Sequence, residues 1–425
     1  MFVTNRIYNI NGKITVPGDK SISHRAIMLS SISKGTSKIT GFLKGEDCLS
    51  TIDCFRKLGI KIEDKGKEII VYGKGLQGLT EPEDILDAGN SGTTMRLISG
   101  VLSGQEFLTV ITGDSSLRKR PMARIAEPLR QMGASIEGRD KGNLAPLVIR
   151  GGNLKSIDYK SPVSSAQVKS AILLAGLYSK GNTIVREEVI SRDHTENMLK
   201  YLGANIKTEN GVVTVGKSEL YGQDINVPGD ISSAAFFIAA ASAMPGSNLI
   251  VEKVGLNHTR TGIIDVLRNM GADIEVDNVF ASGGEEIGDI IVKGTKLKGT
   301  CLTGDMIPRL IDEIPVIAII AAVAEGKTTI TGAEELKVKE SNRITAMVTE
   351  MKKLGIKVTE LPDGMEIEGP NVIGGGTVDS YGDHRIAMAM AVAGLFAEAP
   401  VKILNSQCIA VSFPGFEQKL KEVTK

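Results

Sequence analysis

Residues 18–35 read GDKSISHRAIMLSSISKG, and this stretch predicts an apolar helix that begins among charged and hydroxyl side chains. We expect the helix to run to Ile32 and to stop at Gly35, because glycine readily adopts the backbone of a helix end. A short strand at Ser37–Thr40 and a second helix at Asp47–Leu58 follow, with two more strands after them. The pattern is a β-α-β-α-β-β unit.

This unit recurs along the chain at intervals of about 70 residues, which is typical of a repeat architecture. Glycines end the first helix of successive units, with Ala399-Pro400 in the sixth place: Gly35, Gly104, Gly181, Gly246 and Gly326. Further glycines end the second helices: Gly59, Gly133, Gly203, Gly271 and Gly355. We therefore expect six units of α/β structure, since a repeated unit needs neighbours to bury its apolar face.

A repeated quartet marks where the chain is expected to cross between domains. Val16-Pro17-Gly18-Asp19 recurs as Val227-Pro228-Gly229-Asp230, with three units between the quartets and three outside them. We expect two similar three-unit domains, one inserted at 18–227 and one made of 1–17 plus 228–425. Clefts between domains are common ligand sites.

The sixth unit lacks final strands, because its second helix, near Phe416–Val423, runs to the end of the sequence. Asn11-Gly12 is a strong hairpin signal between Arg6–Ile10 and Lys13–Val16. We expect this hairpin to complete the sixth unit.

Composition narrows the class of protein. The 425 residues carry 50 basic and 50 acidic side chains, so net charge favours neither nucleic acid nor a membrane surface as a partner. The four cysteines form no C-x-x-C pair, which favours reduced thiols in the cytoplasm. No apolar run approaches the roughly 20 residues that span a bilayer. We expect a cytoplasmic protein without a catalytic metal, since the four histidines lack metal spacing.

The starts of the predicted helices carry groups suited to anions. Exposed N–H groups and the helix dipole favour negative charge there. In 18–227 these starts are Gly18–Arg25, Asn90–Arg96, Ser164–Lys169 and Arg192–Glu196, with Arg118-Lys119-Arg120-Pro121 as a positive loop. Taken singly, Gly18–Arg25 favours an anion site over a plain helix cap, whereas Arg118–Pro121 is more typical of a solvated charge run, and a capped helix or turn stays open for the others.

The second half supplies carboxylates at helix starts, at Asp312-Glu313, Glu340 and Asp383-His384-Arg385. A carboxylate among cations keeps its charged form and can act as a base. A structural ion pair is the alternative for each.

Taken together, these motifs resemble 5-enolpyruvylshikimate-3-phosphate synthase from end to end. The combination that carries the resemblance is Gly18–Arg25, Asn90–Arg96, Arg120-Pro121-Met122, Ser165–Lys169, Lys339–Arg343 and Asp383–Arg385. The resemblance implies two inside-out α/β barrels that close on substrate. It also implies transfer of the enolpyruvyl group from phosphoenolpyruvate to the 5-hydroxyl of shikimate 3-phosphate by addition and elimination, without a cofactor, in a monomer.

The resemblance also implies roles for individual residues. Catalysis would fall to Asp312 as base and Glu340 as acid, with Lys20 between the two ligands. Shikimate 3-phosphate would be held by Lys20, Ser21, Arg25, Ser164, Ser165, Gln167, Arg192, Asp312 and Lys339. Phosphoenolpyruvate would be held by Lys20, Asn90, Gly92, Arg120, Gln167, Arg343, His384 and Arg385.

Two features subdivide the family. Val411 stands where glyphosate-sensitive plant and enterobacterial-type enzymes carry a lysine. Arg192–Glu196, Ser165–Lys169 and Asn257–Arg260 resemble the class associated with glyphosate tolerance, whereas Gly92 is retained where the best-known tolerant enzymes have alanine. Glyphosate tolerance therefore stays open.

Two alternatives remain at this stage. The enolpyruvyl transferase acting on UDP-N-acetylglucosamine shares the fold, but its reactive cysteine would fall within Gly113–Met122, which contains none. RNA 3′-phosphate cyclases contain related units, but the neutral charge argues against an RNA-processing protein.

Overall fold

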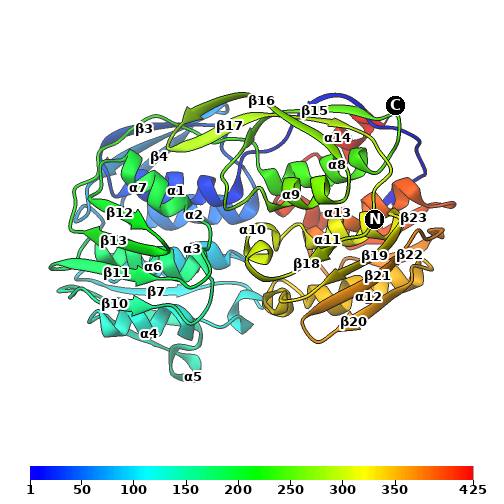
Figure 1. Cartoon of the computed structure of the whole chain (residues 1–425). Helices are drawn as coiled ribbons and strands as arrows, with labels where there is room; N and C mark the ends of the chain where they lie inside the picture. The colour runs from blue at the N-terminus through cyan, green and yellow to red at the C-terminus, as the bar shows by residue number, and fades with distance from the viewer. Residues whose placement is uncertain (425) are drawn as a thin grey trace. The chain divides into compact units, whose positions relative to one another are not determined.

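A computed structural model describes residues 1–424 and divides the chain into two compact units, and Figure 1 labels many of their helices and strands. Unit 1 comprises Met1–Pro17, Pro228–Phe280 and Glu286–Lys425, and unit 2 comprises Gly18–Val227 with Ala281–Glu285. The chain thus changes units within both Val-Pro-Gly-Asp quartets. The tip of one hairpin, residues 281–285, is grouped with unit 2.

Each unit contains three sheets built to one plan, in which a parallel pair of strands is extended by an antiparallel strand. The first sheet of unit 2 has the spatial order β14 (Ile225–Asn226), β3 (Lys34–Thr40), β5 (Glu68–Lys74), β4 (Lys61–Asp64). The second has the order β6 (Leu86–Asp87), β7 (Leu108–Thr112), β9 (Leu144–Arg150), β8 (Ser135–Gly138). The third has the order β10 (Asp158–Lys160), β11 (Asn182–Arg186), β13 (Val212–Gly216), β12 (Ile206–Glu209). The first sheet of unit 1 has the spatial order β16 (Asp273–Ser282), β17 (Glu285–Lys293), β15 (Asn248–Gly255), β2 (Asn11–Thr15). The second has the order β18 (Cys301–Leu302), β19 (Gly326–Ile330), β21 (Gly364–Gly369), β20 (Val358–Leu361). The third has the order β1 (Phe2–Thr4), β23 (Val401–Leu404), β22 (Gly376–Asp379). The six predicted units are confirmed.

The first helix of every unit is buried and the second is amphipathic. The first helices are α1 (Lys20–Ser31), α3 (Gly92–Leu102), α6 (Ala166–Gly176), α8 (Ile231–Ser242), α11 (Ile314–Val323) and α13 (His384–Phe396). The second helices are α2 (Glu46–Lys57), α4 (Ala123–Gln131), α7 (His194–Tyr201), α9 (Gly262–Asn269), α12 (Arg343–Lys353) and α14 (Phe416–Val423), and α5 (Arg139–Gly142) and α10 (Ile307–Leu310) are short. Every residue of α8 is buried, which requires apolar or small side chains on all faces. Three such helices pack together inside each unit, so the expected inside-out α/β barrels are confirmed.

The predicted hairpin around Asn11-Gly12 is wrong. Residues 5–10 form no strand, and β2 instead pairs in parallel with β15, with Asn11 opposite Asn248. The N-terminus does complete the sixth unit, but through β1, which pairs antiparallel with β23. The short-range turn signal was outweighed by a sheet partner more than half the chain away.

The strand that precedes each crossover stays in the unit that the chain is leaving. β2 leads toward α1 yet belongs to a unit 1 sheet, and β14 leads toward α8 yet pairs with β3 of unit 2. The first helix start of each unit therefore follows directly after a crossover quartet.

Candidate active site

In unit 2, Arg25 joins the starts of three helices. Its Nε donates to Thr195 Oγ1 at 2.7 Å, Nη2 donates to Ser170 Oγ at 2.8 Å, and Nη1 donates to the carbonyl oxygen of Ser21 at 3.0 Å. Burial lowers the pKa of Arg25 to about 10, against the attraction of Glu196. The guanidinium remains charged at neutral pH and is held rigidly by neutral oxygens.

The start of α3 forms a second cluster of donors. Asn90 accepts from Arg120 Nη2 at 2.7 Å and donates to Asp114 Oδ2 at 2.6 Å. A Cβ added at Gly92 would lie 3.1 Å from Arg96 Nη1 and 3.4 Å from Arg120 Nη1. Residue 92 therefore faces two guanidinium groups, as an anion-binding helix start requires.

Gln167 connects this cluster to the start of α6. Its Oε1 accepts from Arg96 Nη1 at 2.5 Å, and its Nε2 donates to Thr93 Oγ1 at 3.0 Å. Ser165 is the N-cap residue of α6, and the hydroxyl of Ser164 is buried without a hydrogen-bond partner within residues 1–424. A buried hydroxyl in that state is a candidate ligand contact.

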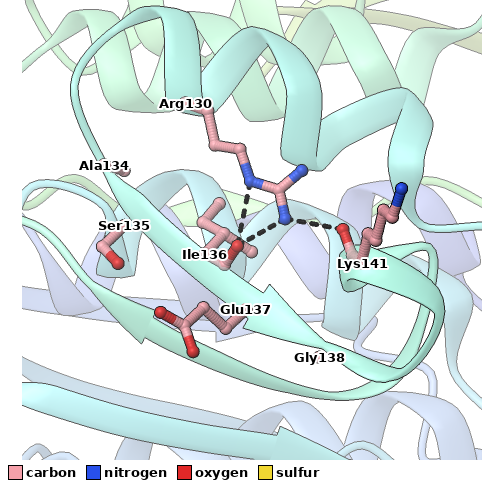
Figure 2. A pocket seen from close by; sticks show the side chains of 7 residues that line it. All are labelled: Arg130, Ala134, Ser135, Ile136, Glu137, Gly138 and Lys141. Carbon is pink, nitrogen blue, oxygen red and sulfur yellow. Dashed lines mark hydrogen bonds between the residues drawn. The ribbon is translucent and has the colours of Figure 1, made fainter.

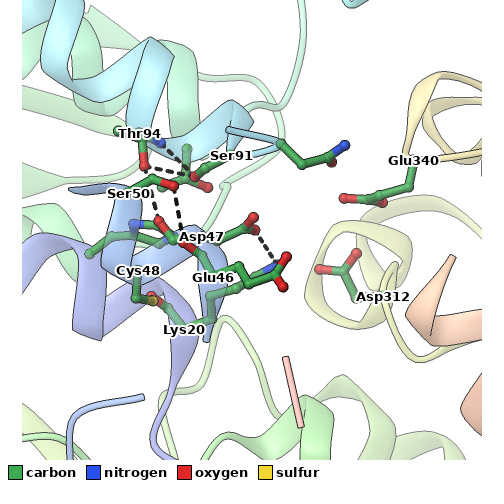
Figure 3. Close-up of polar contacts among 12 residues, drawn as sticks. Lys20, Glu46, Asp47, Cys48, Ser50, Ser91, Thr94, Asp312 and Glu340 are labelled. Carbon is green, nitrogen blue, oxygen red and sulfur yellow. Dashed lines mark hydrogen bonds and ion pairs between the residues drawn. The ribbon is translucent and has the colours of Figure 1, made fainter. Parts of the chain in front are cut away.

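Lys20 begins α1 and forms an ion pair with Asp47, with Nζ 3.2 Å from Oδ2 (Figure 3). Both side chains are mostly buried. In the same view Ser91 caps α3, accepting from the Thr94 amide at 3.0 Å.

Lys169, in the first turn of α6, has a buried ammonium group that lies 2.7 Å from Glu187 Oε2 and 2.8 Å from Glu196 Oε1. Burial alone would lower the pKa of Lys169, but the two carboxylates outweigh it and raise that pKa. This ion cluster adjoins the helix start that carries Thr195. It was not predicted, since Lys169 was read only as part of a motif.

In unit 1, Arg343 gathers three carboxylates at the start of α12. Its Nη1 lies 3.0 Å from Asp312 Oδ1, Nη2 lies 2.6 Å from Glu340 Oε2, and Nε lies 2.8 Å from Asp383 Oδ2. Burial opposes its charge, but the three carboxylates raise the pKa of Arg343 above its ordinary value. Lys339 Nζ lies 3.7 Å from Asp312 Oδ1. The predicted base and acid thus share one guanidinium.

His384 and Arg385 open α13 behind the N-cap residue Asp383, which accepts from the Arg385 amide at 2.9 Å. Arg385 Nη1 donates to the carbonyl oxygen of Ser232 at 3.1 Å, and its guanidinium lies 6.0 Å from the centroid of the Phe236 ring. Val411 ends a short 3₁₀ helix, Ser406–Val411, and can supply no charge.

The sequence analysis named residues that the structure places at helix starts, and it did not identify several of their hydrogen-bond partners. Arg192 precedes α7 and is partly buried, as a helix-start residue should be. Arg96 and Asp383 were inside quoted motifs, so their position at a helix start could have identified them. Thr195, Ser170 and Glu187 could not be paired from spacing alone.

A cavity of about 540 Å³ elsewhere in unit 2 contains none of the predicted site residues (Figure 2). Arg130, which is partly buried, donates to the carbonyl oxygens of Ile136 at 2.9 Å and Lys141 at 2.8 Å. This cavity is therefore separate from the helix starts described above.

Within residues 1–424, no helix is long and apolar enough to cross a membrane. Nor do three or more His, Cys, Asp or Glu side chains of that part gather so as to hold a metal ion.

Comparison with known proteins identifies the family. The family model "EPSP synthase (3-phosphoshikimate 1-carboxyvinyltransferase)" matches residues 4–420. A 3-phosphoshikimate 1-carboxyvinyltransferase of Alkaliphilus metalliredigens is 75% identical over 425 residues, covering 100% of both chains. One of Desulforamulus reducens is 54% identical over 99% of each chain. A solved EPSP synthase of Acinetobacter baumannii superposes with a TM-score of 0.90 at 47% identity, covering 99% of this chain and 98% of that one.

The six repeated units and their likeness to a solved EPSP synthase place the chain in a class of two-domain α/β transferases. Within that class, the chain belongs to the EPSP synthase family. It is a carboxyvinyltransferase of the shikimate pathway, which confirms the sequence-based resemblance over the cell-wall and RNA-processing alternatives.

Proposed function

We propose that the two helix-start clusters divide the transfer of the enolpyruvyl group from phosphoenolpyruvate to shikimate 3-phosphate between substrate binding and acid–base chemistry. The observation that carries this proposal is Arg343, which holds Asp312 and Glu340 on adjacent nitrogens of one guanidinium. Two carboxylates held in one place can serve as base and acid in the same turnover.

The acid–base steps follow from the reaction. Asp312 takes the proton of the 5-hydroxyl as that oxygen attacks the central carbon of phosphoenolpyruvate. Glu340 delivers a proton to the methylene carbon, giving a tetrahedral intermediate. Loss of a methyl proton and of phosphate then restores the double bond.

Both substrates carry a carboxylate and a phosphate, so binding needs concentrated positive charge and N–H donors. Unit 2 supplies donors for shikimate 3-phosphate from Lys20, Ser21, Arg25, Ser164, Ser165, Gln167 and Arg192, and unit 1 adds Lys339. Phosphoenolpyruvate takes Asn90, Gly92 and Arg120 from unit 2, and Arg343, His384 and Arg385 from unit 1. The rigid seating of Arg25 and Arg385 supports these roles, because pre-positioned charges lose little entropy on binding.

A cytoplasmic location, a monomeric state and independence from cofactors are parts of the same proposal; the location rests on the composition, and the other two rest on the family resemblance given above. Gel filtration of the purified chain tests the monomer, and an elution volume of a dimer would contradict it.

The test of function is phosphate release with phosphoenolpyruvate plus shikimate 3-phosphate, repeated with UDP-N-acetylglucosamine. We expect release with the first pair alone. Release only with the nucleotide sugar would overturn the proposal.

The acid–base roles are tested separately by Asp312→Asn and Glu340→Gln. We expect turnover to fall at least ~10²-fold in each variant with binding of shikimate 3-phosphate retained, because proton transfer is lost while shape is kept. Glu334→Gln is the matched control, since Glu334 is exposed nearby and should tolerate the change. Near-normal turnover in either test variant would remove the assigned role from that residue.

A further inference from the structure

Four helix starts of unit 1 meet in a buried polar cluster, of which only Arg385 has a role in the proposed function. It consists of Asp230, Ser232, Arg260, Glu313 and Arg385, all nearly inaccessible to solvent. Asp230 and Ser232 begin α8, Glu313 is the N-cap residue of α11, Arg385 is in the first turn of α13, and Arg260 precedes α9.

Ser232 is the hub of this cluster. Arg260 Nη2 donates to Ser232 Oγ at 2.7 Å and to Asp230 Oδ1 at 3.1 Å. Ser232 Oγ also makes a very short hydrogen bond with Glu313 Oε1. Arginine can only donate, so the serine oxygen accepts from Arg260 and its single hydrogen goes to the carboxylate. The direction of the chain of hydrogen bonds is thereby determined.

The main chain of Ser232 extends the same network toward the proposed ligand site. Its carbonyl oxygen accepts from Arg385 Nη1 at 3.1 Å. Glu313 directly follows Asp312, so holding the Glu313 side chain also holds the peptide that carries the proposed base. The cluster balances two guanidinium groups against two carboxylates, as buried charges require.

We infer that Ser232, secured by Arg260, is a positioning residue that holds the Arg385 guanidinium with its carbonyl and the Asp312–Glu313 turn with its hydroxyl. This inference rests on the proposed roles of Asp312 and Arg385. Ser232 itself need not touch either substrate. Its effect is on geometry, and displacements of about 1 Å in a reacting constellation can cost ~10²-fold in rate.

The test is Ser232→Ala, with Ser242→Ala as the matched control. Ser242 lies in the same helix and is equally buried, and its hydroxyl has no hydrogen-bond partner in the described part of the chain. We expect Ser232→Ala to lower kcat and raise KM for phosphoenolpyruvate, together reducing kcat/KM roughly 10- to 100-fold. The dissociation constant of shikimate 3-phosphate should change less than about twofold, since the main contacts proposed for it lie on other elements. Ser242→Ala should leave all three constants unchanged.

Double variants identify the route of the effect. Alanine keeps the carbonyl group of residue 232, so loss of the hydroxyl reaches Arg385 only by displacing the start of α8. If it does so, adding Ser232→Ala to Arg385→Lys should raise KM for phosphoenolpyruvate less than the product of the single effects. Adding it to Arg120→Lys should multiply the effects. Should Ser232→Ala fail to fold, Arg260→Lys gives the same test, because an ammonium lacks the planar fork that reaches both partners.

Unchanged kcat and KM in Ser232→Ala, with a lowered melting temperature, would overturn the inference and leave only a structural serine. An equal loss of affinity for both substrates would also overturn it. Absence of phosphate release from the wild-type enzyme would instead overturn the proposed function, and the inference with it, so the two failures are distinguishable.

Discussion

At the scale of single residues, Gly92 is the most informative position. The nearest neighbours of an added Cβ there are the guanidinium nitrogens of Arg96 and Arg120, at 3.1 and 3.4 Å. These are the mobile ends of long side chains, so alanine can be accommodated at the expense of space beside the cations. Gly92 is thus a determinant of how much room an anion has at the start of α3.

We predict that Gly92→Ala raises the inhibition constant of glyphosate by about tenfold or more, since one carbon in a tight pocket discriminates on that scale. KM for phosphoenolpyruvate should rise less, because it is the shorter ligand. Steady-state inhibition measured against phosphoenolpyruvate checks this. An equal rise in both constants would show that the helix start, not the size of the pocket, has been disturbed.

Residue identities were predictable where the motif was local. Asn90–Arg96 and Lys339–Arg343 were predicted as candidate ligand groups because a helix start concentrates donors within a few residues, and the structure does place them at the starts of α3 and α12. The pairing of Arg25 with Thr195 joins residues far apart in sequence. Such pairs depend on how whole helices pack, so they could not be predicted from composition and spacing.

At the scale of elements, the residue that caps α3 contributes to stability and also lies between two proposed ligand contacts. The Ser91 hydroxyl accepts from the Thr94 amide at 3.0 Å and from the Thr94 hydroxyl at 2.8 Å. The residues on either side of this cap, Asn90 and Gly92, are the proposed ligand contacts. Loosening the cap therefore affects both stability and binding.

We predict that Ser91→Ala destabilises the protein by about 1 kcal/mol, the usual value of a helix cap. Ser99→Ala is the control on the same helix, because the Ser99 hydroxyl bonds only to the Met95 carbonyl, which already serves the helix. The midpoint of urea unfolding measures both. A larger loss in Ser99→Ala would contradict the capping argument.

The hairpin error at Asn11-Gly12 is also an error at this scale. The turn residues are suitable for a hairpin, and Gly12 does adopt a left-handed backbone with φ of +119°. The Asn11 side chain, however, accepts from the Asn248 backbone amide at 2.7 Å, and β2 pairs in parallel with β15. Local turn chemistry predicts a bend but does not choose the partner strand.

At the scale of the whole molecule, stability depends on pH through a buried histidine. His24 is fully buried and its Nδ1 lies 2.7 Å from Thr51 Oγ1, which in turn bonds Thr94 Oγ1 at 2.7 Å. Burial, with the charges of Lys20 and Arg25, lowers the pKa of His24 well below its ordinary value of 6.5. Near pH 6.5 the His24 imidazole therefore takes up a proton in the unfolded chain but stays neutral in the folded chain.

It follows that this contribution to stability is complete above about pH 6.5 and is lost as the pH falls toward the folded-state pKa. We predict that the wild-type protein loses up to about 1.4 kcal/mol more than His24→Asn for each pH unit below that value. Urea unfolding of both proteins at pH 7.5, 6.5 and 5.5 measures the difference. Parallel pH profiles would show that His24 accepts a proton in the folded state.

The repeat was predictable because glycine ends the first and the second helix of the first five units at regular intervals. The structure shows a left-handed backbone at most of them, for example φ of +102° at Gly35 and +84° at Gly59. At Gly104 it is packing that requires glycine, because a Cβ there would lie 2.2 Å from the Tyr178 ring.

The placement of β1 and β2 has a consequence for biosynthesis on the ribosome. Residues 2–15 leave the exit tunnel before residues 18–227, yet their sheet partners, β15 and β23, are translated only after the whole of that segment. At roughly 5–20 residues per second, β2 waits on the order of 10–50 s for β15, and β1 waits still longer for β23. The inserted segment has its own apolar core and can fold during that interval. The order of synthesis thus allows the inserted unit to fold first, while β1 and β2 stay without their sheet partners until β23 and β15 are made.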